Sequence, residues 1–243
     1  MGLRSIKNIF ALTHETDRVI DSWPGTVGVS VQGGKRGIKL YESDWMDKYI
    51  ASAHPITPAL WYGPLIAYAF YDAAVATTIS WLPFLGVYFL GVLAWTLLEY
   101  VMHKYLFHLK IKNTPKMKRF LFLMHGYHHE FPQHETRLVA PPAMSWTFGG
   151  VLIGLIYLAF GGNAYWLSMA AGTMTGYIAY DMIHYSVHTF TPRTRFGKAL
   201  REYHFIHHYK APTKNFGISN PLWDVIFGTF VTSKSLESEK ASS

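Results

Sequence analysis

The charged residues of this chain are distributed so unevenly that they constrain its fold more than any other feature. Residues 49–98 carry a single charged side chain, Asp72, and residues 138–192 carry a single one, Asp181. The hydrocarbon core of a bilayer is roughly 30 Å thick and requires about 20 apolar residues per helix. Each stretch can therefore hold two membrane-spanning helices joined by a tight turn.

Turn-forming residues divide each stretch into a helical hairpin, because Gly and Pro favour turns. The predicted spans and turns are residues 56–79, a turn at Trp81-Leu82-Pro83, residues 84–101, residues 142–160, a turn at Gly161-Gly162-Asn163, and residues 164–183. Composition agrees, since 50% of the residues are hydrophobic and only 15% are charged, against about 25% charged in soluble domains. The alternative is a set of buried helices in a very apolar soluble protein.

The basic residues predict how these hairpins are oriented. All 22 Lys and Arg residues lie outside the predicted spans: seven precede the first hairpin, seven lie between Lys104 and Arg137, and eight lie from Arg193 onward. Because cytoplasmic loops carry an excess of Lys and Arg, the N-terminus, the central loop and the C-terminal segment are all predicted to be cytoplasmic. The net charge of +7 then reflects membrane topology, and no nucleic-acid partner is needed.

The remaining segments complete the predicted organisation. Residues 1–55 are expected to form a cytoplasmic N-terminal segment without a signal peptide, residues 56–232 a membrane domain, and residues 233–243 a disordered tail. The tail lacks a di-lysine retrieval signal, which favours a bacterial inner membrane over the endoplasmic reticulum. The chain has no Cys, which excludes disulfides, iron–sulfur clusters and thiolate metal sites within it.

The spacing of the histidines is the sequence feature that most directly indicates a chemical function. Ten of the thirteen fall in four clusters: His103 and His108; His125, His128 and His129; His184 and His188; and His204, His207 and His208. Residues three and four apart share a helix face, so three of these clusters can each direct several imidazoles to one region. His103 and His108 are five apart, about 140° around an ideal helix. We therefore expect the helix to end or distort between them, or the two to serve different ions.

The clusters meet on one side of the membrane in the predicted topology. Ten imidazoles exceed the needs of one ion but suit two ions with about five ligands each, and neutral imidazole suits iron, zinc, copper and nickel. The sequence thus predicts an all-α integral membrane protein with two transmembrane hairpins (four spans) and a cytoplasmic histidine-rich helical cap that binds two metal ions. The alternatives are surface histidines or a structural zinc site, which needs only four ligands. His14, His54 and His134 are isolated and are predicted not to bind metal.

Further motifs surround these clusters. They are Glu99-Tyr100-Val101-Met102-His103 through Phe107-His108, His125-Gly126-Tyr127-His128-His129, Arg137-Leu138-Val139-Ala140-Pro141-Pro142, Gly176-Tyr177, Tyr180-Asp181 through His184-Tyr185 to His188, Tyr203-His204 to His207-His208, Phe216-Gly217-Ile218-Ser219, and Leu222-Trp223-Asp224 through Phe227-Gly228-Thr229. Over about residues 95–230 the chain resembles the fatty acid hydroxylase/sterol desaturase superfamily, and most closely the fatty acid 2-hydroxylases. The resemblance implies a non-haem di-iron or other dimetal monooxygenase centre, O2, two external electrons, and hydroxylation at carbon 2 of a long acyl chain, free or in a sphingolipid.

The sequence differs from the family pattern in two ways, and each difference leads to a separate prediction. Many relatives carry a fused b-type cytochrome domain with a His-Pro-Gly-Gly motif, which this sequence lacks. Electrons are therefore expected from a separate protein, a b-type cytochrome or a ferredoxin with its reductase. Relatives usually place an acid where this chain has His134, so a hydrogen bond near the site is expected to differ.

Three charged residues near the clusters are candidates for supporting roles. Asp181 precedes His184 by three residues, where a carboxylate within a span is costly and usually functional. Since a ligating imidazole commonly donates its second N–H to a carboxylate, Asp181 is predicted to hold a ligand, with a Tyr or backbone partner as the alternative. Glu99 is a weaker candidate for the same role. Arg137 is expected to bind a lipid headgroup or to be an ordinary interfacial cation.

The predicted catalytic residues are Asp181 and the central ligands His128 and His207, because breaking an unactivated C–H bond requires an oxidant that a metal supplies. Alternatives within the superfamily are reactions on a sterol, a carotenoid or a sphingoid base. Alternatives of other classes are a metal transporter or sensor and a zinc-dependent lipid hydrolase. Transporters place their ligands near the bilayer midplane, whereas these clusters lie at the ends of the predicted spans.

Overall fold

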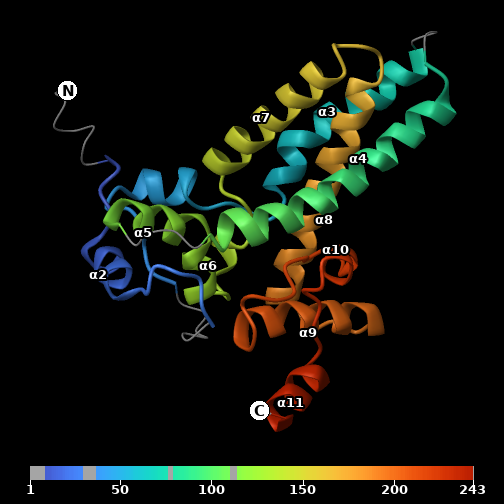
Figure 1. The fold of residues 1–243 in the computed structure, drawn as a ribbon. Helices are drawn as coiled ribbons and strands as arrows, with labels where there is room; N and C mark the ends of the chain where they lie inside the picture. Colours follow the sequence, from blue (N-terminus) through green and yellow to red (C-terminus); the bar gives the residue numbers. More distant parts are fainter. Residues whose placement is uncertain (1–8, 30–36, 76–78, 110–113, 243) are drawn as a thin grey trace.

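Four long helices form the main body of the protein. The structure, a computed structural model, describes residues 9–29, 37–75, 79–109 and 114–242. The long helices are α3 (Thr57–Val75), α4 (Trp81–Val101), α7 (Pro142–Ala159) and α8 (Trp166–Thr189). They run alongside one another, and the shorter helices gather at one end of them (Figure 1). Within the described residues the only β-type pairing is an isolated antiparallel bridge between Leu12 and Tyr41.

The helix bounds follow the predicted hairpins with two differences. Gly161 and Gly162 form the second turn as predicted, with positive φ angles of 60° and 68° that glycine adopts without steric cost. Trp81-Leu82-Pro83, predicted as the first turn, is instead the first turn of α4. Proline is tolerated there because the first amides of a helix have no intrahelical acceptor. Helix α8 continues to Thr189, beyond the predicted end at Ile183, and residues 76–78 of the first predicted hairpin lie outside the described residues.

Helix α8 lies at the centre of the long helices and contacts α3, α4 and α7. Its Ala170, Ala171 and Met174 are fully buried. A Cβ atom added to Gly172 would lie 1.9 Å from the carbonyl oxygen of Tyr88, so α4 and α8 cross at a distance that only glycine permits. Small residues at such crossings are typical of helices that pack within membranes.

Two helical segments are long and apolar enough to cross a membrane, namely Trp81–Phe107 and Glu135–Ala159. Their outward faces are apolar: Leu82 and Phe89 on α4 are 83% and 63% exposed, and Leu158 on α7 is 72% exposed. Large apolar side chains exposed in this number mark a surface that water does not cover in the working protein. The all-helical fold and these two segments are consistent with an integral membrane protein.

The N-terminal segment shares a core with the cap. Its elements are α2 (His14–Ser22) and the π-helical turn η1 (Met46–Ile50), and the adjoining cap elements are α5 (Pro115–Leu121), η3 (Phe122–Gly126) and α6 (Tyr127–Glu130). Ile20, Trp23 and Leu40 pack with Phe122 and Tyr127 in one buried cluster. The N-terminal segment is therefore an integral layer of the cap.

The C-terminal part corrects one prediction. After α9 (Arg195–Tyr209) and α10 (Leu222–Ile226), the segment expected to be disordered forms helix α11 (Ser233–Ser242). Local bonds favour this helix, because the amide of Ser235 donates to Oγ1 of Thr232 at 3.1 Å and the amide of Thr232 donates to Oγ of Ser235 at 2.9 Å. Such reciprocal bonds satisfy amides that the first helical turn leaves free.

Candidate metal centre

The end of α4 is distorted where the sequence predicts it. His103 lies within the π-helical turn η2 (Met102–Phe107) and His108 directly follows it, and the amide of His108 donates to the carbonyl oxygen of His103 at 3.1 Å. A π-helical turn bonds residues five apart and is frequent at functional sites. It therefore brings these two rings, which a regular helix would separate by about 140°, to the same side.

All ten clustered histidines converge in two adjacent groups of five. The first group contains His103, His108, His125, His129 and His207, and the second contains His128, His184, His188, His204 and His208. The ring nitrogens that face one another within each group lie within 4.8 Å of one another. The groups adjoin, since the rings of His129 and His208 stack with centroids 4.2 Å apart. Neither group includes a carboxylate.

Each histidine triplet contributes to both groups. In the first triplet His125 and His129 belong to the first group and His128 to the second. In the second triplet His204 and His208, four residues apart on α9, belong to the second group, and His207 belongs to the first. Residues four apart share a helix face, whereas an adjacent residue points about 100° away. Two short helical arcs thereby supply both groups.

Backbone carbonyl groups orient four of the rings. The Nδ1–H groups of His103, His129, His184 and His207 donate to the carbonyl oxygens of Phe216 (2.5 Å), Gly28 (3.1 Å), Leu138 (2.8 Å) and Lys214 (2.7 Å), respectively. A carbonyl oxygen can only accept, so Nδ1 must carry the proton in each of these rings. The Nε2 atom of each neutral ring is then left with a free lone pair, which is the form that binds a metal ion.

The facing nitrogens provide a test of whether a cation fits. The Nε2 atoms of His129 and His207 lie 3.2 Å apart, and both rings carry their proton on Nδ1. Two lone pairs therefore face each other with no hydrogen between them, an arrangement that a shared cation would stabilise. The donor set is ten imidazoles without thiolate, which suits iron, zinc, copper or nickel. These residues fit a pair of transition-metal ions.

Burial keeps the histidines of the cap neutral. Loss of hydration on burial, followed by repulsion from neighbouring rings, lowers the pKa of His128, His129 and His208 well below the usual value. The pKa of His207 falls from 6.5 to about 4, because burial outweighs the opposing effect of its bond to the Lys214 carbonyl. Neutral imidazole is the ligand form, so the site is ready for a metal ion at neutral pH.

Two buried acids hold the loop that orients His103 and His207. Asp224 accepts hydrogen bonds from the amides of Phe216 (2.9 Å) and Gly217 (2.7 Å). Glu99 accepts from the amides of Ile218 and Ser219. Glu99 thus supports a ligand indirectly, through this loop. The sequence had suggested it as a weaker candidate for a direct hydrogen bond to a histidine ring, and it makes no such bond. Asp224 was assigned no role from the sequence, although an acid within the apolar run Leu222–Phe227 is a signal that could have identified it.

An apolar cavity of about 280 Å³ adjoins the centre. Three of the ten histidines line it, namely His125, His128 and His184. Val151 and Leu155 also line it and are 59% and 57% exposed on the outer face of α7. The cavity therefore extends from the histidines to the apolar outer surface of the helices.

Asp181 does not contact a histidine ring, contrary to the main prediction for it. The Nδ1–H of His184, the ring it was expected to hold, donates to the Leu138 carbonyl oxygen instead. Asp181 interacts with Tyr177 and the backbone amide of Ala140, which was the alternative prediction. The reason is geometric: the loop before α7 places the Leu138 carbonyl oxygen at the Nδ1–H of His184, so this position is not open to Asp181.

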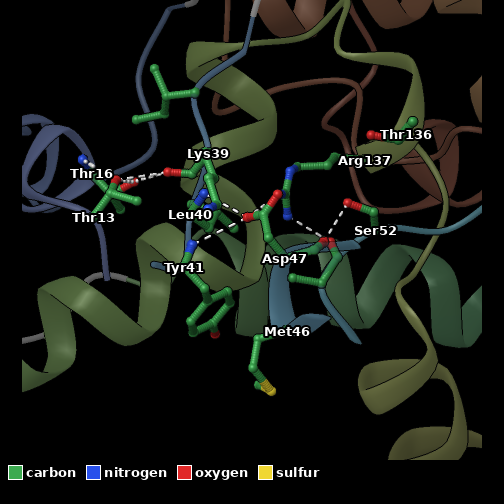
Figure 2. Close-up of polar contacts among 12 residues, drawn as sticks. Thr13, Thr16, Lys39, Leu40, Tyr41, Met46, Asp47, Ser52, Thr136 and Arg137 are labelled. Atoms are coloured by element: carbon green, nitrogen blue, oxygen red, sulfur yellow. Dashed lines mark hydrogen bonds and ion pairs between the residues drawn. The ribbon is translucent and has the colours of Figure 1, made fainter. Parts of the chain in front are cut away.

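Arg137 is neutralised within the protein. Its guanidinium group donates to Oδ1 of Asp47 at 2.7 Å and to the carbonyl oxygen of Ala51 at 2.6 Å. Figure 2 shows this side chain facing Asp47, which also accepts from the amides of Leu40 and Tyr41. Arg137 is thus committed to the N-terminal segment and is not free to bind a lipid headgroup as a cation.

The isolated histidines, His14, His54 and His134, lie outside both groups. His14 and His54 are exposed. His134, which replaces the acid usual in relatives, shares a hydrogen bond of 2.7 Å with the hydroxyl of Tyr127. That hydroxyl has one hydrogen, which it donates to the carbonyl oxygen of Ile38 at 2.8 Å, so the Nδ1–H of His134 donates to the hydroxyl oxygen of Tyr127.

The fold and the site together define a class of protein, a helical bundle whose cap holds paired five-histidine groups beside an apolar cavity. A family model described as fatty acid hydroxylase matches residues 88–229. A dihydroceramide fatty acyl 2-hydroxylase of Arabidopsis thaliana is 30% identical over 217 residues, which cover 85% of each chain. The human fatty acid 2-hydroxylase is 32% identical over 228 residues, covering 82% of this chain and 58% of the relative.

A solved structure agrees with these sequence relationships. Full-length scs7p, of which only the hydroxylase domain is visible, superposes with a TM-score of 0.72 at 28% identity, covering 81% of this chain and 73% of that one. The chain belongs to the fatty acid hydroxylase family.

Proposed function

We propose that this protein is a membrane-bound dimetal monooxygenase that hydroxylates long acyl chains at carbon 2. The observation that carries the proposal is the apolar cavity that reaches His125, His128 and His184 at one end and the exposed face of α7 at the other. An acyl chain can enter such a cavity sideways from the bilayer. The names of the relatives, which are 2-hydroxylases of fatty acids and of dihydroceramide acyl chains, support the choice of carbon 2.

The ten histidines would hold two ions, one in each group of five, and we propose iron, with zinc as the alternative. Bound iron would supply the activation of O2 that cleavage of an unactivated C–H bond requires. The residues of the chain keep ten imidazoles neutral, exclude water from the cavity and orient the acyl chain beside His128 and His184. His128 and His207 are proposed as the most critical ligands, one in each group. Nε2 of His128 lies 2.9 Å from that of His184 and 3.0 Å from that of His208, and Nε2 of His207 lies 3.2 Å from that of His129.

Four membrane spans are part of the proposal. Helices α3 and α8 have 19 and 24 residues, or about 28 and 36 Å at 1.5 Å per residue, so they match α4 and α7 in reach. Lys and Arg are absent from all four helices, which supports a cytoplasmic cap. The membrane domain would comprise residues 56–232, and the membrane would be a bacterial inner membrane or the endoplasmic reticulum.

Electrons are proposed to come from a separate protein, a b-type cytochrome or a ferredoxin with its reductase. No Cys is present for an iron–sulfur cluster. Purified protein should show no haem absorbance and should turn over only when such a donor system is added. Turnover with reduced nicotinamide cofactor alone would contradict this part of the proposal.

Lipid analysis of cells that express the protein tests the function. Cells with the wild type should accumulate 2-hydroxy acyl chains in an O2-dependent manner, and cells with the His128→Ala variant should not. The His54→Ala variant is the matched control, since His54 is exposed and outside both groups. A product that forms without O2 or reductant would indicate a zinc hydrolase, and a hydroxylated sterol would indicate another reaction of the superfamily.

A further inference from the structure

The two histidine groups differ in how many of their rings are fixed by the protein backbone. In the first group, three rings each donate their Nδ1–H to a backbone carbonyl oxygen, namely those of His103, His129 and His207. In the second group His184 makes such a bond. The buried Nδ1 atoms of three other second-group rings have no hydrogen-bond partner among the described residues, and these rings are His128, His188 and His204. The backbone therefore prepares the first group for a metal ion more fully than the second.

The unfixed rings can carry their proton where it opposes a metal ion. Nε2 of His128 lies 2.9 Å from Nε2 of His184, and Nε2 of His188 lies 2.9 Å from Nε2 of His204. Because no described residue holds the proton on Nδ1, His128 and either His188 or His204 can carry it on Nε2 and donate it to the facing ring. An ion that binds these Nε2 atoms must displace the protons to buried Nδ1 positions without an acceptor, which costs free energy. The facing pair of the first group described above has both protons on Nδ1 and no such bond to lose.

The charges beside the two groups differ in the same direction. Arg201 on α9 lies beside the second group, since its guanidinium carbon is 4.8 Å from the centre of the Phe205 ring and that ring is 5.7 Å from the ring of His188. Its positive charge acts on His188, and Arg201 forms none of the three ion pairs found among the described residues. Beside the first group, the carboxylate of Asp224 acts on His207 with the opposite sign. These charges repel a cation at the second group and attract one at the first.

We propose that the two groups bind their ions unequally, the second group at least about tenfold more weakly than the first, so that the second ion binds last and is lost first. This inference rests on the two-ion centre of the proposed function. Loss of the hydrogen bond behind a ligand typically lowers metal affinity 10–100-fold, and three second-group rings lack that bond. His128 and His184 of the second group line the cavity, so the weakly held ion lies beside the acyl chain. The supply of metal then sets the fraction of the protein that is active.

Metal titration of the purified protein tests the inference by a measurement other than activity. The protein, stripped of metal by a chelator in detergent and titrated with Zn²⁺ at buffered free concentrations, should bind two ions with dissociation constants at least about tenfold apart. The His188→Ala variant should weaken the weaker step and leave the tighter one unchanged, whereas His207→Ala should weaken the tighter step. The Arg201→Gln variant should tighten the weaker step about threefold or more, because it removes a repelling charge from a region of low dielectric constant.

A matched control is Lys198→Gln, which removes an exposed cation one turn earlier on α9 and should leave both constants unchanged, because solvent screens its charge. Equal constants in the wild type, loss of the tighter step in His188→Ala, or no tightening in Arg201→Gln would overturn the inference.

If the stripped protein does not stay folded, dialysis of the loaded protein against buffered Zn²⁺ replaces the titration. One ion per chain should then remain over at least about a tenfold range of free metal, and loss of both ions together would overturn the inference. Two unequal binding steps in a protein that hydroxylates no acyl chain would overturn the proposed function and leave this inference standing. Absence of metal binding by the wild type would overturn both.

Discussion

Arg137 and Asp47 form a largely buried ion pair, with a nitrogen–oxygen distance of 2.7 Å and side chains that are 5% and 19% exposed. The pair joins the N-terminal segment to the loop that precedes α7 (Figure 2). The same segment reaches the metal centre, because the carbonyl oxygen of Gly28 accepts the Nδ1–H of His129. The segment thus supports the site although the family match begins at residue 88.

Replacing Asp47 with alanine is expected to destabilise the protein strongly. The change leaves the Arg137 guanidinium and two backbone amides without their acceptor, and breaking a buried pair costs about 3–5 kcal/mol. Thermal unfolding in detergent should show a clear fall in the midpoint, accompanied by lower metal content. The control is Asp44→Ala, which removes an ion pair with Lys39 whose carboxylate is 96% exposed and should leave the midpoint unchanged. An equal fall in both variants would contradict this account.

Metal analysis of the purified protein should find two ions per chain. The His128→Ala and His207→Ala variants each remove a ligand from a different group. Each should lower the metal content and reduce hydroxylation by at least about a hundredfold, while membrane insertion is retained. Loss of a hydrogen bond behind a ligand typically costs 10–100-fold, and loss of the ligand itself should cost more. Normal metal content and activity are expected of His14→Ala, and a defect there would mean that the site extends further than the two groups.

Cysteine labelling can test the membrane topology, since the natural chain contains no Cys to interfere. Asn163, in the turn between α7 and α8, and Arg193, between α8 and α9, are both exposed. When the protein is expressed in a bacterial inner membrane, a membrane-impermeant thiol reagent should label Asn163→Cys in intact cells and should label Arg193→Cys only after the membrane is opened. Labelling of both residues in intact cells would exclude a cytoplasmic cap.

The metal-free protein should lose stability on mild acidification. Burial lowers the pKa of His207 from 6.5 to about 4, so between these values the unfolded chain binds more protons than the folded one. The free energy of unfolding therefore rises with pH in this window. Its contribution from His207 is complete above about pH 6.5 and is lost as the pH falls towards 4. Urea unfolding of the metal-free protein at pH 7.5 and at pH 5 measures the difference, and equal stability at both values would argue against neutral buried rings.

The sequence alone determined the helical class, the hairpins and the identity of the clustered histidines. Charge-free runs and the absence of Lys and Arg from them are properties of local sequence, because one misplaced charge would be costly within a bilayer. The spacing of His204 and His208 likewise predicts one shared helix face whatever surrounds it. Even the distortion between His103 and His108 could be predicted, since no regular helix directs both rings to one point.

Only the tertiary structure decided which groups face these histidines. Carboxylates were expected behind the rings, yet carbonyl oxygens from Gly28, Leu138, Lys214 and Phe216 occupy those positions. Any residue type carries a carbonyl group, so the sequence contains no signal for such a partner. The partner of Arg137 was equally unpredictable from the sequence, because its ion pair with Asp47 depends on how a segment ninety residues earlier folds back. Long-range contacts of this kind are set by packing, which no local pattern records.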